Sequence, residues 1–151
     1  MATKVAGDIH EWLKAARDPR IAVLDEPETR IPWPGQKRSV WPWADLSGTL
    51  VTGERFIVEI DDHADPGRSI VKYWPLLHAV SIGAFEYPTI RFLEISSPDS
   101  TFGEGYEILA RFVGDRLAER YPGRFRFAYT SLAGKSAKEL GAEILAFLGA
   151  K

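Results

Sequence analysis

Cysteine is absent from the 151 residues of the chain. A disulfide scaffold, a thiolate metal site and a cysteine nucleophile are therefore excluded. Long apolar runs are absent as well, since none approaches the roughly 18 residues of a membrane span. Asp8, His10 and Glu11 interrupt the apolar residues near the N-terminus. The sequence thus predicts a protein without a signal peptide, without membrane attachment and of cytoplasmic location.

An excess of positive charge is also lacking. The chain has 19 Lys and Arg residues against 21 Asp and Glu residues, for a formal net charge of −2. A strongly basic coat for nucleic acid is therefore excluded, whereas a local basic patch stays compatible with this total. The hydrophobic share of 45% and the charged share of 26% are typical of one globular domain. Since no internal repeat and no Gly/Ser linker divides the chain, we expect residues 1–151 to form a single domain.

Hydrophobic periodicity predicts the order of helices and strands. Short strands come first and include a hairpin that turns at Gly53, whereas the later strands alternate with helices. Such alternation is typical of parallel crossovers. The predicted fold class is α/β: a mixed sheet with an N-terminal antiparallel hairpin block and flanking helices. The predicted helices cover 9–16, 68–80 (broken at Pro75), 106–120 and 136–148, and the predicted strands cover 21–24, 48–51, 55–60, 89–95 and 124–129, with an extended segment over 38–46.

Three acidic residues are the strongest candidates for a functional site. Glu59 and Asp61 are two positions apart at the end of an apolar strand, so they point to the same face of the sheet. Folding the hairpin about Gly53 brings Asp45 roughly opposite one of them. A divalent cation would remove the repulsion between three close carboxylates, and oxygen ligands suit Mg²⁺ or Mn²⁺. Simple solvation of acids at a strand end is the competing interpretation.

A cationic pair follows the acidic strand. Arg68 and Lys72 are four residues apart on the next predicted helix, so both can reach back toward the end of the sheet. A lysine in this place can orient the attacking water in metal-assisted phosphodiester hydrolysis, and offset developing charge. A salt bridge from Lys72 to Asp61 or Asp62 explains its position equally well.

These residues together resemble the motif of the PD-(D/E)XK nuclease superfamily, whose fold is similar to that of type II restriction endonucleases. The resemblance covers about residues 5–95 and implies that Asp45 and Glu59 are metal ligands. Where the motif has a lysine two residues after the glutamate, this chain has Asp61, and Ala44 stands where a proline is frequent. The superfamily includes members whose lysine has moved to the neighbouring helix, and Lys72 is placed for that role.

Aromatic and basic residues alternate before the hairpin. Trp33, Trp41 and Trp43 lie within eleven positions, and Lys37 and Arg38 stand between them. Interleaved cations and aromatic rings can follow a nucleic-acid backbone and stack on its bases. A loop that covers the core, or a contact in a homodimer, is the alternative interpretation.

A short Gly134-Lys135-Ser136 sequence opens the last predicted helix and resembles the end of a phosphate-binding loop. The full pattern requires a glycine five residues before Gly134, and that residue is Tyr129. We therefore interpret Ser131 or Ser136 as a helix N-cap.

Two functions follow from the sequence. The first is a Mg²⁺- or Mn²⁺-dependent nuclease of restriction-endonuclease-like fold that acts on DNA, with Asp45, Glu59 and Asp61 at the metal, Lys72 at the phosphate or water, and Arg68, Lys37 and Arg38 on the nucleic-acid backbone. The second is a non-catalytic binding or assembly module on the same fold, favoured by the missing motif lysine. An open cleft that holds the two motif acids and Lys72 supports the first, whereas a lysine locked to a carboxylate away from a cleft supports the second.

Overall fold

The computed structural model describes residues 4–33, 35–61, 70–83, 88–96 and 105–151. At its centre is a five-stranded mixed sheet with the strand order β1-β4-β5-β6-β7. The pairs β1–β4 and β4–β5 are antiparallel, and β5–β6 and β6–β7 are parallel. The sheet strands are β1 (Ile21–Leu24), β4 (Leu46–Leu50), β5 (Arg55–Asp61), β6 (Ile90–Ser96) and β7 (Phe125–Ser131). The predicted α/β class and the antiparallel block at the N-terminal side of a mixed sheet are thus confirmed.

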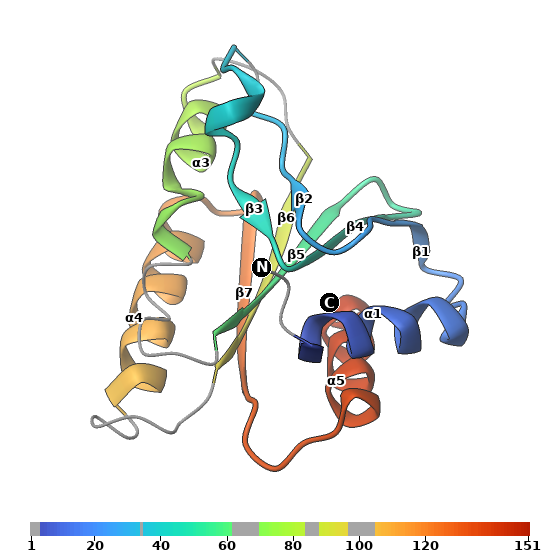
Figure 1. Ribbon diagram of the computed structural model, residues 1–151. Coiled ribbons are helices and arrows are strands. Elements are labelled where there is room, and N and C mark those ends of the chain that lie inside the picture. The colour runs from blue at the N-terminus through green and yellow to red at the C-terminus, as the bar shows by residue number, and fades with distance from the viewer. Residues whose placement is uncertain (1–3, 34, 62–69, 84–87, 97–104) are drawn as a thin grey trace.

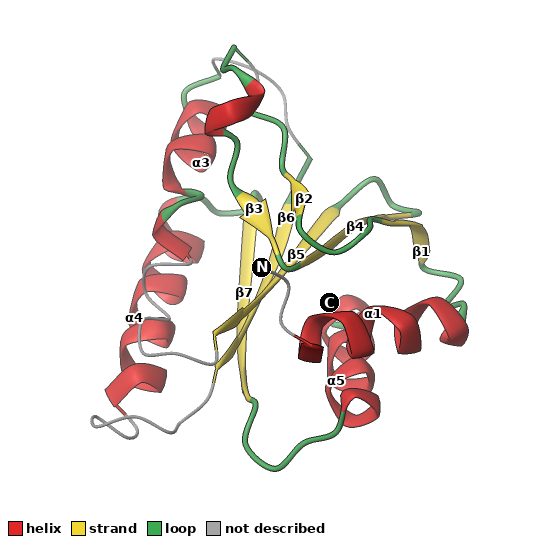
Figure 2. Cartoon of the chain, in the orientation of Figure 1, coloured by secondary structure: helices red, strands yellow, loops and turns green. Residues whose placement is uncertain are grey.

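Helices cover both faces of this sheet (Figure 1 and Figure 2). The terminal helices α1 (Lys4–Ala16) and α5 (Ala137–Gly149) contact each other on one face. The helices α3 (Trp74–Ser81) and α4 (Gly105–Arg120) lie on the other face, where α4 contacts β7. No helix of the described residues is long and apolar enough to cross a membrane.

Strand alternation divides the interior into two cores. On β5, the side chains of Phe56, Val58 and Ile60 join the core under α1 and α5. Ile57 joins the core under α3 and α4. Since side chains alternate between the faces of a strand, Glu59 and Asp61 belong to the α3/α4 side, as the two-residue spacing predicts.

The β4–β5 hairpin turns at Thr52 and Gly53. Its register pairs Thr49 with Arg55 and Leu46 with Val58. Continued by one residue, this register places Asp45, just before β4, opposite Glu59. Gly53 has a φ of 86°, a left-handed conformation that glycine adopts without steric cost. The predicted hairpin is therefore confirmed, with its centre one residue nearer the N-terminus than Gly53.

The helix predicted before strand β6 is broken, as Pro75 requires. Ile70 and Val71 are helical, Lys72 and Tyr73 form a turn, and α3 then begins with the proline at its second position. A proline is tolerated there because the first turn of a helix does not use its N–H groups. The break sets Lys72 and Tyr73 outside regular helix, beside the end of the sheet.

The segment predicted as extended over 38–46 is only partly so. It begins with a 3-10 helix (Arg38–Val40), and β3 (Trp43–Ala44) then pairs with β2 (Thr29–Arg30) in a separate two-stranded ribbon. The proline-rich stretch before it thus carries a short strand that the sequence did not predict. Ser136 is confirmed as a helix N-cap, because its hydroxyl accepts the Glu139 backbone N–H in a capping box.

Candidate functional site

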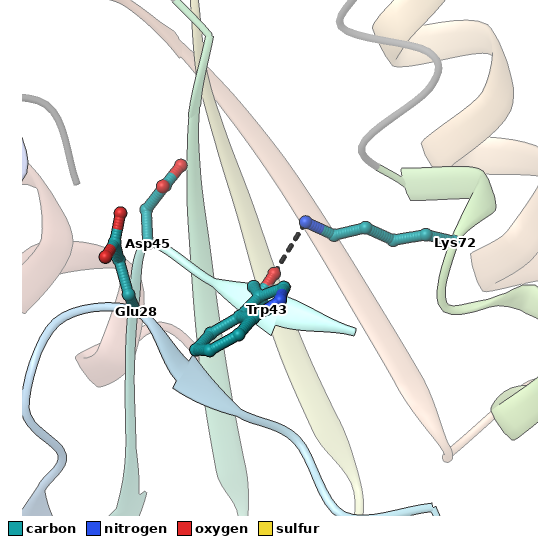
Figure 3. Close-up of a pocket in the computed structure, with 4 residues that line it drawn as sticks. All are labelled: Glu28, Trp43, Asp45 and Lys72. Atoms are coloured by element: carbon teal, nitrogen blue, oxygen red, sulfur yellow. Dashed lines mark hydrogen bonds between the residues drawn. The ribbon is translucent and has the colours of Figure 1, made fainter. Parts of the chain in front are cut away.

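A cavity of about 270 Å³ lies beside the end of strand β5, where the small ribbon meets the main sheet. Its lining residues are Glu28, Trp43, Asp45 and Lys72. Figure 3 shows the carboxylates of Glu28 and Asp45 on one side and the ammonium group of Lys72 reaching in from the other. Two of the predicted site residues therefore face each other across an open space.

Asp45 is held at the position that continues the β4–β5 ladder. Its Oδ2 accepts a hydrogen bond of 2.8 Å from the backbone N–H of Ile60. Burial raises the pKa of Asp45, and this hydrogen bond and the positive charge of Lys72 oppose that rise. Asp45 therefore has a structural role in the sheet, and its carboxylate also forms part of the cavity wall.

Glu59 lies behind the cavity wall and is only 3% exposed. Its Oε1 is 2.8 Å from Lys72 Nζ and accepts a hydrogen bond of 2.5 Å from the Tyr73 hydroxyl. Burial raises the pKa of Glu59 to about 7, against the opposing effect of Lys72, and the negative charge of Asp45 contributes to the rise. Asp45, Glu59 and Lys72 thus lie together as predicted, and Lys72 forms an ion pair with Glu59. Asp62, one of the two acids predicted as its alternative partner, lies outside the described residues.

Lys72 makes a second contact that fixes its place. Its Nζ donates a hydrogen bond of 2.6 Å to the backbone carbonyl of Trp43, drawn in Figure 3. The Tyr73 hydroxyl lies 3.1 Å from the same carbonyl oxygen. An ammonium group has three N–H donors, and the contacts with Glu59 and the Trp43 carbonyl use two of them among the described residues.

Asp61 and Glu94 form a second acidic pair next to Glu59. Glu94 is fully buried on β6, directly beside Glu59 in the parallel register. Burial raises the pKa of Glu94 to about 12, and the negative charges of Asp61 and Glu59 contribute to the rise. Both carboxyl oxygens of Glu94 are buried without a hydrogen-bond partner among the described residues. Glu94 is therefore a neutral carboxylic acid at neutral pH, and Asp61 is not among the described residues that line the cavity.

Glu28 is a site residue that the sequence analysis missed. Its backbone has a φ of 61°, which is uncommon for a residue other than glycine. Pro27 precedes Glu28 in the sequence. The backbone N–H of Glu28 donates a hydrogen bond of 3.4 Å to the carbonyl of Asp45. A proline followed by a residue of positive φ is typical of a tight turn. This turn brings the Glu28 side chain to the cavity, and strain of this kind gathers at functional sites.

Two of the basic residues predicted for a nucleic-acid contact, Lys37 and Arg38, are not among the described residues that line the cavity. Lys37 and Arg38 are exposed at the 3-10 helix between β2 and β3. The carbonyl of Arg38 accepts a hydrogen bond from Arg30. Arg68 lies outside the described residues.

The donor set around the cavity suits a hard divalent cation, since it consists of carboxylate oxygens. In the part of the chain that the structure describes, no three acidic or histidine side chains are grouped closely enough to hold a metal by themselves. Mg²⁺, however, is commonly bound through one or two carboxylates, with water and substrate phosphate as the other ligands. Asp45 lines the cavity, whereas Glu59 lies behind its wall with Oε1 in contact with Lys72 and Tyr73, so a metal ion held by both carboxylates stays a prediction.

Comparison of the chain with protein-family models, with curated proteins and with solved structures gave no match. The resemblance to PD-(D/E)XK nucleases and the restriction-endonuclease-like fold therefore stay predictions.

Proposed function

We propose that this protein hydrolyses phosphodiester bonds of nucleic acid, with DNA as the first candidate substrate, in a reaction that requires Mg²⁺ or Mn²⁺. One observation carries the proposal: Asp45 and Lys72 line the same cavity, and Glu59 lies 2.8 Å from the lysine ammonium at its wall. The two acids and Lys72 agree with what the resemblance implies for a member whose motif lysine has moved to the neighbouring helix. The antiparallel strands that precede the helix and the parallel strand that follows it agree with the same motif.

Asp45 and Glu59 would hold the metal ion, with Glu28 as a third carboxylate on the cavity wall. A bound divalent ion supplies Lewis acidity and offsets the negative charge of the phosphate. The acidic residues would otherwise repel a phosphodiester, because two acidic side chains and one lysine line the cavity. We therefore expect substrate binding to depend on the cation.

Lys72 would bind the scissile phosphate. Its contacts with Glu59 and with the Trp43 carbonyl fix two of its three N–H donors, and its side chain lines the cavity. A positively charged donor held in this way stabilises the charge that develops on a phosphate oxygen. Tyr73 keeps Glu59 in place by its hydroxyl and is a positioning residue.

A specific observation favours the second candidate, a non-catalytic binding module. The ammonium group of Lys72 and the carboxylate of Glu59 neutralise each other in a contact that is almost wholly buried on the glutamate side. An ion pair of this kind can be purely structural. In that case the chain would bind its partner without any metal-dependent cleavage.

A cleavage assay separates the two candidates. Labelled single- and double-stranded DNA and RNA are incubated with Mg²⁺, Mn²⁺ or EDTA and the wild type, Asp45→Asn or Lys72→Met. Asparagine keeps an oxygen that can accept the Ile60 N–H, so the variant loses charge but not the hydrogen bond. We expect cleavage only with metal, and a loss of about 100-fold or more in both variants.

The matched control is Glu107→Gln, which removes an exposed acid from a helical ion pair with Arg111. This variant is expected to cleave like the wild type. Cleavage that survives in Asp45→Asn and Lys72→Met would place the activity elsewhere. No cleavage of any of the four substrates by the wild type would favour the binding module.

A further inference from the structure

Trp43 presents a large aromatic surface at the mouth of the cavity. Its side chain is 50% exposed, although tryptophan is among the most costly residues to leave in water. The ring lies between the acidic side of the cavity and Lys72 (Figure 3). The Trp43 backbone, in contrast, is well fixed: its carbonyl accepts from Lys72, and it pairs with Arg30 in the small ribbon. A rigid backbone thus supports a ring that the chain does not cover.

One face of this ring is already occupied from within the chain. The guanidinium of Arg30 lies 3.9 Å from the ring centroid. Three backbone carbonyls hold this guanidinium through Nη1, those of Arg38, Ser39 and Trp41, at 3.0, 3.2 and 3.2 Å. Arg30 therefore acts as a fixed support on one face of the indole, and half of the Trp43 surface stays exposed.

The neighbouring loop is arranged to keep this support rigid. The indole N–H of Trp41 donates to the carbonyls of Trp33 and Gln36, at 3.2 and 3.1 Å. These hydrogen bonds fix the loop beside the Trp43 ring, which is thus a preformed platform. A preformed platform loses little conformational entropy when a flat ligand stacks on it.

We propose that Trp43 is a stacking platform for an unpaired nucleobase, and that the substrate of the site is single-stranded nucleic acid. The inference rests on the proposed function for the position of the phosphate. Lys72 Nζ contacts the carbonyl of Trp43 itself. One nucleotide can therefore lay its base on the indole and direct its phosphate to the ammonium group. Inside a duplex both faces of a base are covered by its neighbours, so only an unpaired or extruded base can stack in this way.

Binding of uncleavable probes tests this inference. The probes are fluorescein-labelled phosphorothioate strands of about 12 nucleotides: oligothymidylate, a strand of the same length without bases, and a blunt duplex. Anisotropy with Mg²⁺ present measures their affinity for the full chain and for Trp43→Ala and Trp43→Phe. Trp74→Ala is the matched control, because Trp74 is 44% exposed on α3 and does not line the cavity.

We expect the wild type to bind oligothymidylate more tightly than the other two probes. Trp43→Ala should weaken oligothymidylate binding by about 5- to 150-fold and leave the affinity for the strand without bases unchanged. Trp43→Phe should recover part of the loss, since it keeps an aromatic face, and Trp74→Ala should bind like the wild type. Thermal unfolding of each variant checks that it is folded.

Two results would overturn the inference: equal affinity of the wild type for the strands with and without bases, or equal losses in Trp43→Ala and Trp74→Ala. The cleavage assay distinguishes these failures from a failure of the proposed function. Metal-dependent cleavage that requires Asp45 but is indifferent to Trp43 refutes only the stacking platform. Binding that depends on Trp43 without any cleavage supports the platform and refutes the hydrolase.

Discussion

Replacing Glu59 with glutamine should change how the stability of the protein depends on pH. The pKa of Glu59 in the folded protein is about 7, against an ordinary value of 4.5, and burial is the largest cause. Between these two values the folded state binds more protons at this position than the unfolded state does. The free energy of unfolding therefore falls as the pH rises from about 4.5 to 7. Glutamine has nearly the same shape and cannot titrate, so the variant lacks this contribution.

The magnitude follows from the pKa values. One pH unit corresponds to 1.36 kcal/mol, so the rise from 4.5 to about 7 is worth about 3 kcal/mol. The difference in unfolding free energy, wild type minus Glu59→Gln, should decrease by about 3 kcal/mol between acidic pH and about pH 8. Lys72, left without its partner in the variant, can be solvated because 35% of its side chain is exposed.

Urea unfolding of both proteins at a series of pH values measures this difference. Other titrating groups are present in both proteins, so most of their contribution cancels in the subtraction. A difference that stays constant with pH would refute the reasoning, since it would mean that Lys72 and Tyr73 fully offset the effect of burial. A difference that increases with pH would mean that they outweigh it.

Three further substitutions, with Gly7→Ala as a control, test the packing and capping of the fold, each by urea unfolding. Tyr73→Phe removes the hydroxyl that contacts the buried carboxylate, and it should cost about 1–3 kcal/mol at alkaline pH; an unchanged stability would contradict that contact. Gly114→Ala should cost about 1–3 kcal/mol, because a Cβ there would collide with the Phe127 ring, whereas Gly7→Ala, with nothing within 4 Å, should be neutral or stabilising. Ser136→Ala should cost about 1 kcal/mol through loss of the capping box, and an unchanged stability would oppose this.

Much of the sheet could be predicted because its rules are local. The turn residues around Gly53 and the apolar strand 55–60 set the hairpin, and strand alternation then sets the face of Glu59. The position of Asp45 near Glu59 could be predicted by counting residues along the hairpin on both sides of the turn. Pro75 interrupts the predicted helix because its ring would collide with the preceding turn in a helix interior. These inferences needed no knowledge of how distant segments pack.

The partners within the site depend on contacts between segments far apart in the sequence. Lys72 could be placed near the acids, but its ion pair with Glu59 depends on how the segment after β5 packs against the end of the sheet. The position of Glu94 beside Glu59 results from a parallel strand pairing, which joins segments far apart in the sequence. Glu28 lies in a proline-rich loop, where a glutamate with positive φ has no sequence signal beyond the preceding proline.

The most direct test of the metal site is calorimetric titration of Mn²⁺ into the wild type and into Glu59→Gln, both with a phosphorothioate single strand present. The strand supplies the phosphate oxygens that complete the coordination of a two-carboxylate site. We predict saturable binding by the wild type and its loss in the glutamine variant, with Glu107→Gln binding like the wild type. Equal heats from the wild type and Glu59→Gln, or no saturable binding at millimolar Mn²⁺, would contradict the assignment of this cavity as a metal-dependent hydrolytic site.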